Sequence, residues 1–282
     1  MIEILKSVLF GIIEGITEWL PISSTGHLII LEKFVNLDFS EDFIEVYRVV
    51  IQLGAIAAVA VLYWKKINPF RLRTDGKAKR LGLDSDVMTL WYKIIVTCIP
   101  AVFVGVFLDD LTEKWFYNFP TVAAALIVFG ILFLFIEKQS KEPTCTELTQ
   151  ITYKNALYIG VWQMIAAIFP GTSRSGATII GGLFAGVSRP VATEYTFLLG
   201  VPVMFGASAL KLFKYWLENG LSFTSLELGV LAVGVLVSFV ISIFALSFLV
   251  SYVKKHSFKP FAWYRIVLGA ILIVYYVITV TA

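Results

Sequence analysis

The sequence has few charged residues and few residues of the kinds that build disulfide or metal frameworks. Only 15% of its 282 residues are Asp, Glu, Lys or Arg, and it contains two histidines and two cysteines. Cys98 lies in an apolar run and Cys145 in a polar stretch, so no disulfide framework is indicated. Long polar segments are also lacking, which leaves no room for a separate soluble domain. The net charge of +3 is small, and we expect no nucleic-acid partner.

What the sequence has instead is apolar length. Hydrophobic residues make up 58% of the chain, against about 45–50% in an ordinary soluble domain. Crossing the hydrocarbon core of a bilayer takes about 20 helical residues. Six stretches are long enough: 41–64, 91–109, 119–136, 190–215, 226–252 and 260–280. We therefore predict an all-α, polytopic membrane protein that forms a single transmembrane domain over residues 1–282.

Four shorter apolar stretches flank two polar turns. Residues 2–18 and 27–36 lie on either side of LPISSTG, and residues 153–169 and 175–187 lie on either side of PGTSRSG. Each is about half the length of a spanning helix, and proline and glycine break each pair in the middle. The pattern predicts four re-entrant half-helices in addition to the six transmembrane helices.

Clusters of positive charge predict the orientation of the chain. Residues 65–86 and 254–260 are strongly basic, whereas residues 109–115 and 217–222 are acidic or neutral. By the positive-inside rule, the basic segments face the cytoplasm and the other two face the outside. The first pair of half-helices then enters the membrane from outside, and the second pair enters from the cytoplasmic side.

The two halves of the chain resemble each other at an offset of 149 residues. This offset aligns GIIEGITEWLPISSTGHLII (11–30) with GVWQMIAAIFPGTSRSGATI (160–179) and pairs Ser24 with Ser173. Together with the opposite orientations, the alignment predicts an inverted-topology repeat whose two breaks meet near the bilayer midplane. The expected halves, joined by a cytoplasmic loop, are about 1–136 and 153–282.

Ionisable side chains on the apolar stretches mark a candidate site: Glu14, Glu18, His27 and Arg174. Exposing a fully charged group to lipid costs about 2.5–3.5 kcal/mol, so these groups are expected to face one another or water. Glu14 and Glu18 are four residues apart, which places both carboxylates on one face of a helix. Such a pair persists by binding a cation, by pairing with Arg174 or by taking up a proton. The alternative is a solvated helix end outside the membrane.

The first polar turn offers hydroxyl groups beside a helix start. In SSTGH (23–27), the backbone amides of a starting helix would form an anion-binding end. The hydroxyl groups that would join them belong to Ser23, Ser24 and Thr25. Ser24 and His27 are three residues apart, a spacing that lets a base activate a nucleophile. Plain N-capping by serine is the alternative.

The second polar turn, PGTSRSGAT (170–178), adds a permanent positive charge. Arg174 carries a planar fork suited to bidentate binding of phosphate oxygens, and Gly171 lets the backbone approach a ligand closely. The hydroxyl groups of this turn belong to Ser173, Ser175 and Thr178. The alternative role of Arg174 is that of a structural counter-ion for the two glutamates.

The stretches EGITEWLPISSTGH and PGTSRSGAT resemble the two signature motifs of the undecaprenyl-diphosphate phosphatases of the bacitracin-resistance type. Glu14 and Glu18 fit an E/Q-x-x-x-E motif, and residues 170–178 fit P-G-x-S-R-S-x-x-T without a departure. The resemblance extends over the whole chain, including VVIQLGAIAAV (49–59) and PFAWYRIVLGA (260–270). It implies a bacterial plasma-membrane enzyme that removes one phosphate from undecaprenyl diphosphate at a site open to the external side.

The same resemblance implies roles for single residues. Ser24 is the implied nucleophile, Arg174 holds the diphosphate, and three groups assist in catalysis: Glu14, Glu18 and His27. The remaining polar groups of the two turns are expected to bind substrate: Ser23, Thr25, Gly171, Ser173, Ser175 and Thr178. Family activity is associated with a divalent cation, Mg²⁺ or Ca²⁺, for which the two glutamates are the expected contacts, and no organic cofactor is implied.

Several alternatives stay open at this point. Direct attack by water competes with attack by Ser24, and the acid, base and metal duties of the other groups are not divided. A homodimer is also open. The main rival to hydrolysis is a transporter or flippase of an anionic polyprenyl phospholipid, because inverted repeats with broken helices also build transporters. A serine close to two carboxylates favours catalysis, since binding alone needs no nucleophile.

Overall fold

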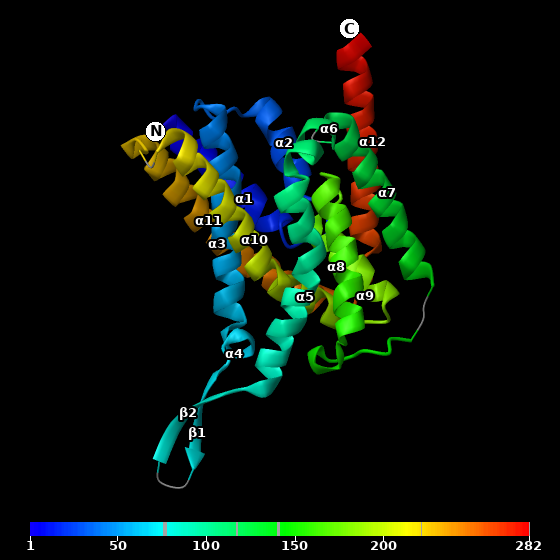
Figure 1. The fold of residues 1–282 in the computed structure, drawn as a ribbon. Helices are drawn as coiled ribbons and strands as arrows, with labels where there is room; N and C mark the ends of the chain where they lie inside the picture. The colour runs from blue at the N-terminus through cyan, green and yellow to red at the C-terminus, as the bar shows by residue number, and fades with distance from the viewer. Residues whose placement is uncertain (76–77, 117, 140–141, 221, 282) are drawn as a thin grey trace.

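The fold consists of a set of long helices and a set of shorter ones (Figure 1). It is seen in a computed structural model that describes the whole chain except residues 76–77, 117, 140–141, 221 and 282. Within the described residues, six helices are long and apolar enough to cross a membrane. They are α3 (Glu41–Leu62), α5 (Ser85–Phe107), α7 (Phe119–Lys138), α10 (Arg189–Asn219), α11 (Ser225–Val253) and α12 (Lys259–Thr281). Each overlaps one of the six expected stretches, so this prediction is confirmed.

Shorter elements complete the fold. Four of them fall where half-helices were expected: α1 (Ile2–Thr17), α2 (Ser24–Phe34), α8 (Tyr153–Ile168) and α9 (Arg174–Phe184). The others are α4 (Trp64–Ile67), α6 (Asp109–Phe116) and the 3₁₀ turn η1 (Leu148–Gln150). The strands β1 (Phe70–Asp75) and β2 (Ala78–Leu83) form an antiparallel hairpin within the basic segment after α3. The all-α prediction is therefore confirmed, with this one hairpin as an addition that was not predicted.

Side-chain caps explain where several helices begin. The carboxylate of Asp84 accepts hydrogen bonds from the amides of Asp86 and Val87, which starts α5 earlier than the expected residue 91. Thr152 and Thr224 form capping boxes at the starts of α8 and α11. These caps satisfy amides that have no partner within their own helix.

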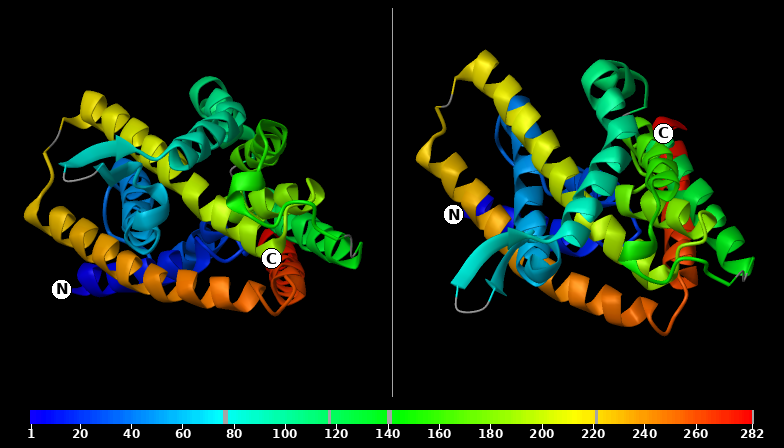
Figure 2. Two further views of the ribbon diagram at one scale, coloured as in Figure 1. Left: turned by 90° about the horizontal axis from the view of Figure 1, so that it is seen from below. Right: turned by 60° about the horizontal axis from the view of Figure 1, so that its bottom comes forward.

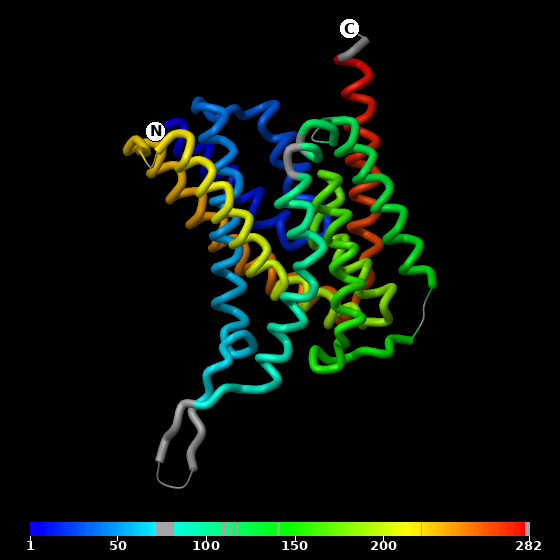
Figure 3. The backbone as a smooth tube through the Cα atoms, in the orientation of Figure 1, coloured from blue at the N-terminus to red at the C-terminus, as the bar shows by residue number. Residues whose placement is uncertain are grey.

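The two pairs of short helices enter the bundle from opposite ends. Figure 3 shows α1 and α2 at the end that carries the N-terminus, and α8 and α9 at the end that carries the α7–α8 connection. In the two views of Figure 2, α3 lies between α10 and α11 and packs on both of them. The helix α1 packs on α11, α8 packs on α5, and α7 packs on α12. This packing brings the two connections between short helices into contact inside the molecule.

The bundle is apolar inside and apolar outside. Its centre holds large buried side chains, such as Trp19, Phe133 and Phe197. Its outer faces also expose large apolar side chains, such as Phe103 on α5 and Ile271 on α12. A protein surrounded by water does not present such a surface over whole helices, whereas a lipid-facing one does. The chain is a multi-pass membrane protein.

Close packing of α3 on α11 predicts a cost for one added methyl group. A Cβ at Gly54 would overlap the backbone carbonyl of Val235, so Gly54→Ala forces the two helices apart. We expect a lower thermal midpoint in detergent, equivalent to about 1–3 kcal/mol of lost stability. The control is Gly105→Ala on α5, where nothing lies within 4 Å of the added group. Equal midpoints for the two variants would contradict the close approach.

Candidate active site

Each pair of short helices is joined by a polar turn that ends in a serine with an unusual backbone. The first turn is residues 18–23 and the second is residues 169–173. Ser23 and Ser173 have φ values of 76° and 71°, a left-handed conformation that few residues other than glycine adopt. Their hydroxyl groups accept hydrogen bonds from the amides of the residues three positions later and so cap α2 and α9. N-capping therefore accounts for Ser23 and Ser173 but leaves Ser24 for another role.

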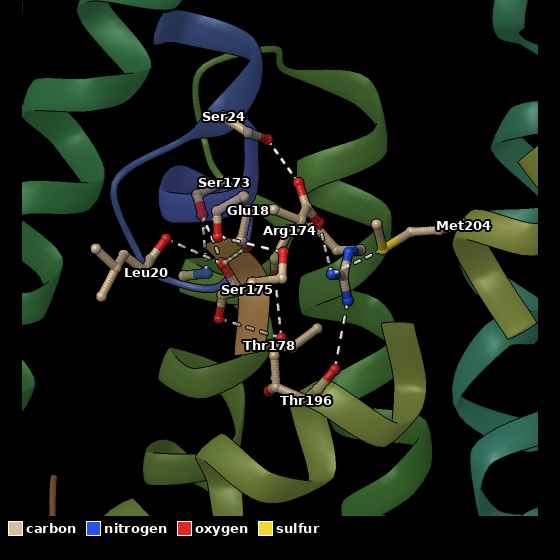
Figure 4. A network of polar contacts seen from close by, with 12 residues as sticks. Glu18, Leu20, Ser24, Ser173, Arg174, Ser175, Thr178, Thr196 and Met204 are labelled. Atoms are coloured by element: carbon tan, nitrogen blue, oxygen red, sulfur yellow. Dashed lines mark hydrogen bonds and ion pairs between the residues drawn. The ribbon is translucent and has the colours of Figure 1, made fainter. Parts of the chain in front are cut away.

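A carboxylate joins the two turns by holding a serine with one oxygen and an arginine with the other (Figure 4). The hydroxyl group of Ser24 donates to Glu18 Oε2 at 2.6 Å. The Nη2 atom of Arg174 donates to Glu18 Oε1 at 2.7 Å and forms an ion pair with it. Glu18 is 7% exposed, so the pair lies in a region of low dielectric, where breaking it is costly.

Two predicted substrate-binding hydroxyls form bonds within the protein: Ser175 links the two turns, and Thr178 links α9 to α10. Ser175 Oγ contacts the backbone carbonyl oxygens of Glu18 and Leu20 at 3.0 and 3.3 Å, so the start of α9 holds the first turn. Thr178 Oγ1 donates to the carbonyl of Arg174 at 2.9 Å and also lies 2.9 Å from Thr196 Oγ1. Ser175 and Thr178 are both buried and lie outside the lining of the cavity described below.

The guanidinium of Arg174 packs closely against α10. Its Nη1 donates to the carbonyl of Thr196 at 3.4 Å, and its Nη2 lies 3.2 Å from Met204 Sδ (Figure 4). The ring of Trp19 lies 5.9 Å from the guanidinium carbon. A Cβ at Gly200 would come within 3.0 Å of both terminal nitrogens. The side chain is therefore positioned by α10 as well as by Glu18.

The other predicted groups, except Glu14 and His27, line an inner cavity of about 220 Å³. The residues of the two turns and helix starts at this cavity are Glu18, Ser23, Ser24, Thr25, Pro170, Gly171, Ser173 and Arg174. Gln163 of α8 and Gln52 of α3 line it as well. The two polar turns thus meet at one cavity, as predicted.

A second, outer cavity of about 280 Å³ adjoins the inner one. Thr25, Gln52 and Pro170 line both of them. The outer cavity is also lined by two charged residues that form an ion pair, Glu45 and Lys211. Gln52 and Glu45 of α3 therefore lie beside the site. Glu194 of α10 pairs with Lys66 and lines neither cavity.

The position of His27 differs from the expectation that it would serve Ser24. Its Nδ1 lies 2.6 Å from the backbone carbonyl of Ser23, and its Nε2 lies 2.6 Å from the hydroxyl group of Tyr264. The two rings are stacked, with centroids 5.6 Å apart. The left-handed backbone at Ser23 places Ser24 at the start of α2, where its hydroxyl group reaches back to Glu18. The expected Ser24–His27 pairing is therefore wrong, and Glu18 is the partner.

Glu14 is fully buried one helical turn before Glu18. Within the described residues, neither of its carboxylate oxygens has a hydrogen-bond partner. The same holds for the amide atoms of Gln163, the residue that the repeat alignment pairs with Glu14. Buried polar atoms without partners are rare in native structures and indicate a missing water, ion or ligand. In the described part of the chain, no cluster of three or more His, Cys, Asp or Glu side chains is arranged to hold a metal ion.

Sequence reasoning missed two groups beside the site. Gln163 was not among the predicted site residues, although a polar side chain in an apolar stretch is a signal of the same kind. Arg265 of α12 is fully buried and reaches both turns, as described below. The sequence indicated Arg265 only as a single arginine within the apolar stretch PFAWYRIVLGA. That stretch entered the argument only through the family resemblance.

The fold and the site together define a multi-pass membrane protein with an arginine, a carboxylate and a serine around a buried polar cavity. A family model described as bacitracin resistance protein BacA matches residues 7–271. The chain belongs to this family.

Curated relatives match over nearly their whole length. The undecaprenyl-diphosphatase of Desulfitobacterium hafniense is 54% identical over 278 residues, which cover 98% of this chain and 97% of the relative. Undecaprenyl-diphosphatase 1 of Clostridium acetobutylicum is 54% identical and covers 98% of both chains. The undecaprenyl-diphosphatase of Enterococcus faecalis is 54% identical and covers 96% of both.

The buried ion pair predicts strong coupling between Glu18 and Arg174. Removing either partner leaves an uncompensated buried charge, whereas removing both does not. A double-mutant cycle of Glu18→Ala and Arg174→Ala, measured by denaturant unfolding in detergent, should give a coupling free energy of about 2 kcal/mol. The control cycle uses the exposed pair of Arg71 and Asp84, where solvent screens the charges and little coupling is expected. Additive effects at Glu18 and Arg174 would contradict the pairing.

Proposed function

We propose that this protein hydrolyses undecaprenyl diphosphate to undecaprenyl phosphate and inorganic phosphate. The reaction renews the lipid carrier for cell-wall polymer synthesis in a bacterial plasma membrane. Relatives that match the chain end to end carry the name undecaprenyl-diphosphatase. The observation that carries the proposal is the chain of contacts from Ser24 through Glu18 to Arg174 beside one cavity.

Binding of the diphosphate rests on charge and on oriented donors. Arg174 lies at the cavity wall, and a guanidinium carries five N–H donors, enough to hold Glu18 and phosphate oxygens at the same time. The first turns of α2 and α9 both lie at this wall, and their positive helix ends favour a phosphate group. Phosphoryl transfer is catalysed mainly by such positioning and charge neutralisation.

The hydrogen bond from Ser24 to Glu18 provides a nucleophile with its base. Glu18 accepts the proton of Ser24 as the serine oxygen bonds to the terminal phosphorus. The bond from phosphorus to the bridging oxygen breaks, and Glu18 passes the proton to the departing undecaprenyl phosphate. Water then attacks the phosphoserine, gives one proton to Glu18, and releases inorganic phosphate while the serine hydroxyl is restored. His27, bonded to the carbonyl of Ser23, assists by fixing the first turn.

We also propose a place for a divalent cation, Mg²⁺ or Ca²⁺. Its ligands would be the unpartnered carboxylate of Glu14 and, beside it, Glu18. Such hard cations are bound through one or two carboxylates together with substrate phosphates and water. When bound, the ion would neutralise charge on the diphosphate. The buried carboxylate of Glu14 would supply negative charge to balance the ion, in a position that lipid cannot reach.

The proposed architecture is an inverted repeat of re-entrant helices. Three features support it: the matched caps at Ser23 and Ser173, the opposite entry of the short helix pairs, and two ion pairs at opposite ends of α10. At one end of α10 Lys211 pairs with Glu45 of α3, and near the other end Glu194 pairs with Lys66 of α4. The caps correct the register of the repeat, because they match Ser173 with Ser23 and not with Ser24.

The site is proposed to open to the external side. The outer cavity is partly lined by Thr112 of α6, a helix at the end of the bundle that carries the N-terminus (Figure 1). The charge pattern assigns this end to the outside.

The direct test is phosphate release by the purified protein in detergent with undecaprenyl diphosphate and a divalent cation. Wild type should release inorganic phosphate, and Ser24→Ala and Arg174→Lys should each lower kcat at least about 100-fold. Matched controls are Ser247→Ala and Arg71→Lys, which change an exposed serine and an exposed arginine far from both cavities. Normal turnover by Ser24→Ala would replace the serine step by direct attack of water. Lipid binding without phosphate release by wild type would contradict hydrolysis and favour a transporter.

The close packing of Arg174 against α10 predicts a second effect on the turnover rate. In Gly200→Ala, the added methyl group presses on both terminal nitrogens of Arg174 and shifts the guanidinium. Because small misplacements of a binding group are costly, kcat should fall roughly tenfold. Gly206→Ala is the control on the same helix, since nothing lies within 4 Å of its added group. Equal rates for the two variants would argue against a positioned Arg174.

A further inference from the structure

A single arginine of α12 contacts both polar turns at once. The guanidinium of Arg265 donates from Nη1 to the carbonyl of Pro21 in the first turn at 3.0 Å. Its Nη2 donates to the carbonyls of Gly171 and Thr172 in the second turn, at 3.1 and 2.7 Å. The side chain is 0% exposed, so these bonds form away from water.

Besides the two turns, this guanidinium contacts a third segment, α7. Longer contacts of 3.4 Å reach the carbonyls of Leu126 and Ala125, and the ring of Phe129 lies 5.8 Å from the guanidinium carbon. Within the described residues, Arg265 forms no ion pair, and every hydrogen bond recorded for it ends on a backbone carbonyl. A buried cation persists without a carboxylate only when it is well hydrogen-bonded, so the acceptors are essential to its place.

The acceptors nearest to the guanidinium are backbone carbonyls of the two polar turns. Both turns break a helix inside the membrane, where backbone carbonyls find no water. Gly171 has φ 89°, and a Cβ there would strike the carbonyl of Val122 on α7, so only glycine presents its carbonyl in this way. A planar fork with five donors can serve carbonyls from three segments, which the three donors of a lysine cannot do in one plane.

We propose that Arg265 is the positioning residue that holds the two polar turns in register. Its link between Pro21 and Thr172 fixes the distance between Ser24, which follows the first turn, and Arg174, which follows the second. This inference rests on the proposed function for its effect on rate, but the link between the turns can be measured without it.

The primary test is amide hydrogen exchange on the full chain in detergent, compared between wild type and Arg265→Lys. Lysine keeps the charge and loses the fork. The amides of Ile22 and Thr172 are protected by hydrogen bonds to Leu20 and Phe169 and report on the two turns. We expect exchange at both turns to become faster together, while the rest of the bundle keeps its protection. Unchanged exchange at the turns, or faster exchange spread evenly over the chain, would overturn the proposal.

The second variant leaves Arg265 itself unchanged, although its site, Phe129, also packs on Trp162 of α8. Phe129→Leu removes the ring beside the guanidinium, and Phe133→Leu is its control, a buried phenylalanine one helical turn later that packs on Phe258. Faster exchange at both turns is expected for Phe129→Leu alone. This pair decides the matter if Arg265→Lys does not fold, and equal exchange in the two variants would count against the proposal.

Kinetics separate positioning from plain stability. Arg265→Lys should lower kcat about tenfold or more per folded molecule, with a smaller change in KM because the lipid tail still binds. Arg189→Lys is the control, since that arginine pairs with Glu137 and contacts neither turn. A kcat that matches wild type while the turns exchange faster would overturn the role in positioning. A wild type without phosphatase activity would refute the proposed function and leave the exchange data to decide the role of Arg265.

Discussion

The ion pair between Glu18 and Arg174 joins segments that are 156 residues apart and keeps both charges out of lipid. Neither charge is tolerable alone in this buried place, because an unpaired buried charge costs more free energy than most single contacts contribute. Each half of the chain therefore depends on the other. As a result of this pairing, the Glu18 carboxylate is held rigidly beside Ser24, and the Arg174 guanidinium is held rigidly beside the same cavity.

The turns between the short helices impose a second requirement, because they place backbone groups inside the bundle. The protein meets it with its own side chains. Ser23 and Ser173 cap the helices that follow, Ser175 contacts two carbonyls of the first turn, and Arg265 binds carbonyls of both. With these structural groups engaged, the Ser24 hydroxyl lies beside the cavity and bonds to Glu18, and the Glu14 carboxylate has no hydrogen-bond partner among the described residues. Structural and chemical roles are thus divided among neighbouring residues of nearly identical type.

Much of this arrangement was predictable, and what was missed follows a pattern. Apolar length located the helices, and the cost of burying charge located the site around Glu18 and Arg174. The partner of Ser24 was not predictable from helical spacing, because a left-handed serine at position 23 redirects the chain just before it. The acceptors of Arg265 are backbone carbonyls, which leave no trace in a sequence. The hairpin of β1 and β2 lies in a basic segment that was used only to orient the chain, although FRLRTD (70–75) alternates apolar and charged residues as a strand does.

The most direct test of the central claim is an experimental structure with a non-hydrolysable methylene-diphosphonate analogue of undecaprenyl diphosphate. The two polar turns should hold the analogue between them. Its terminal phosphonate should lie within hydrogen-bond distance of the Arg174 guanidinium and the Ser24 hydroxyl group, inside the inner cavity. Phosphonate groups bound elsewhere, for example only at Arg48 and Lys211 in the outer cavity, would contradict the account.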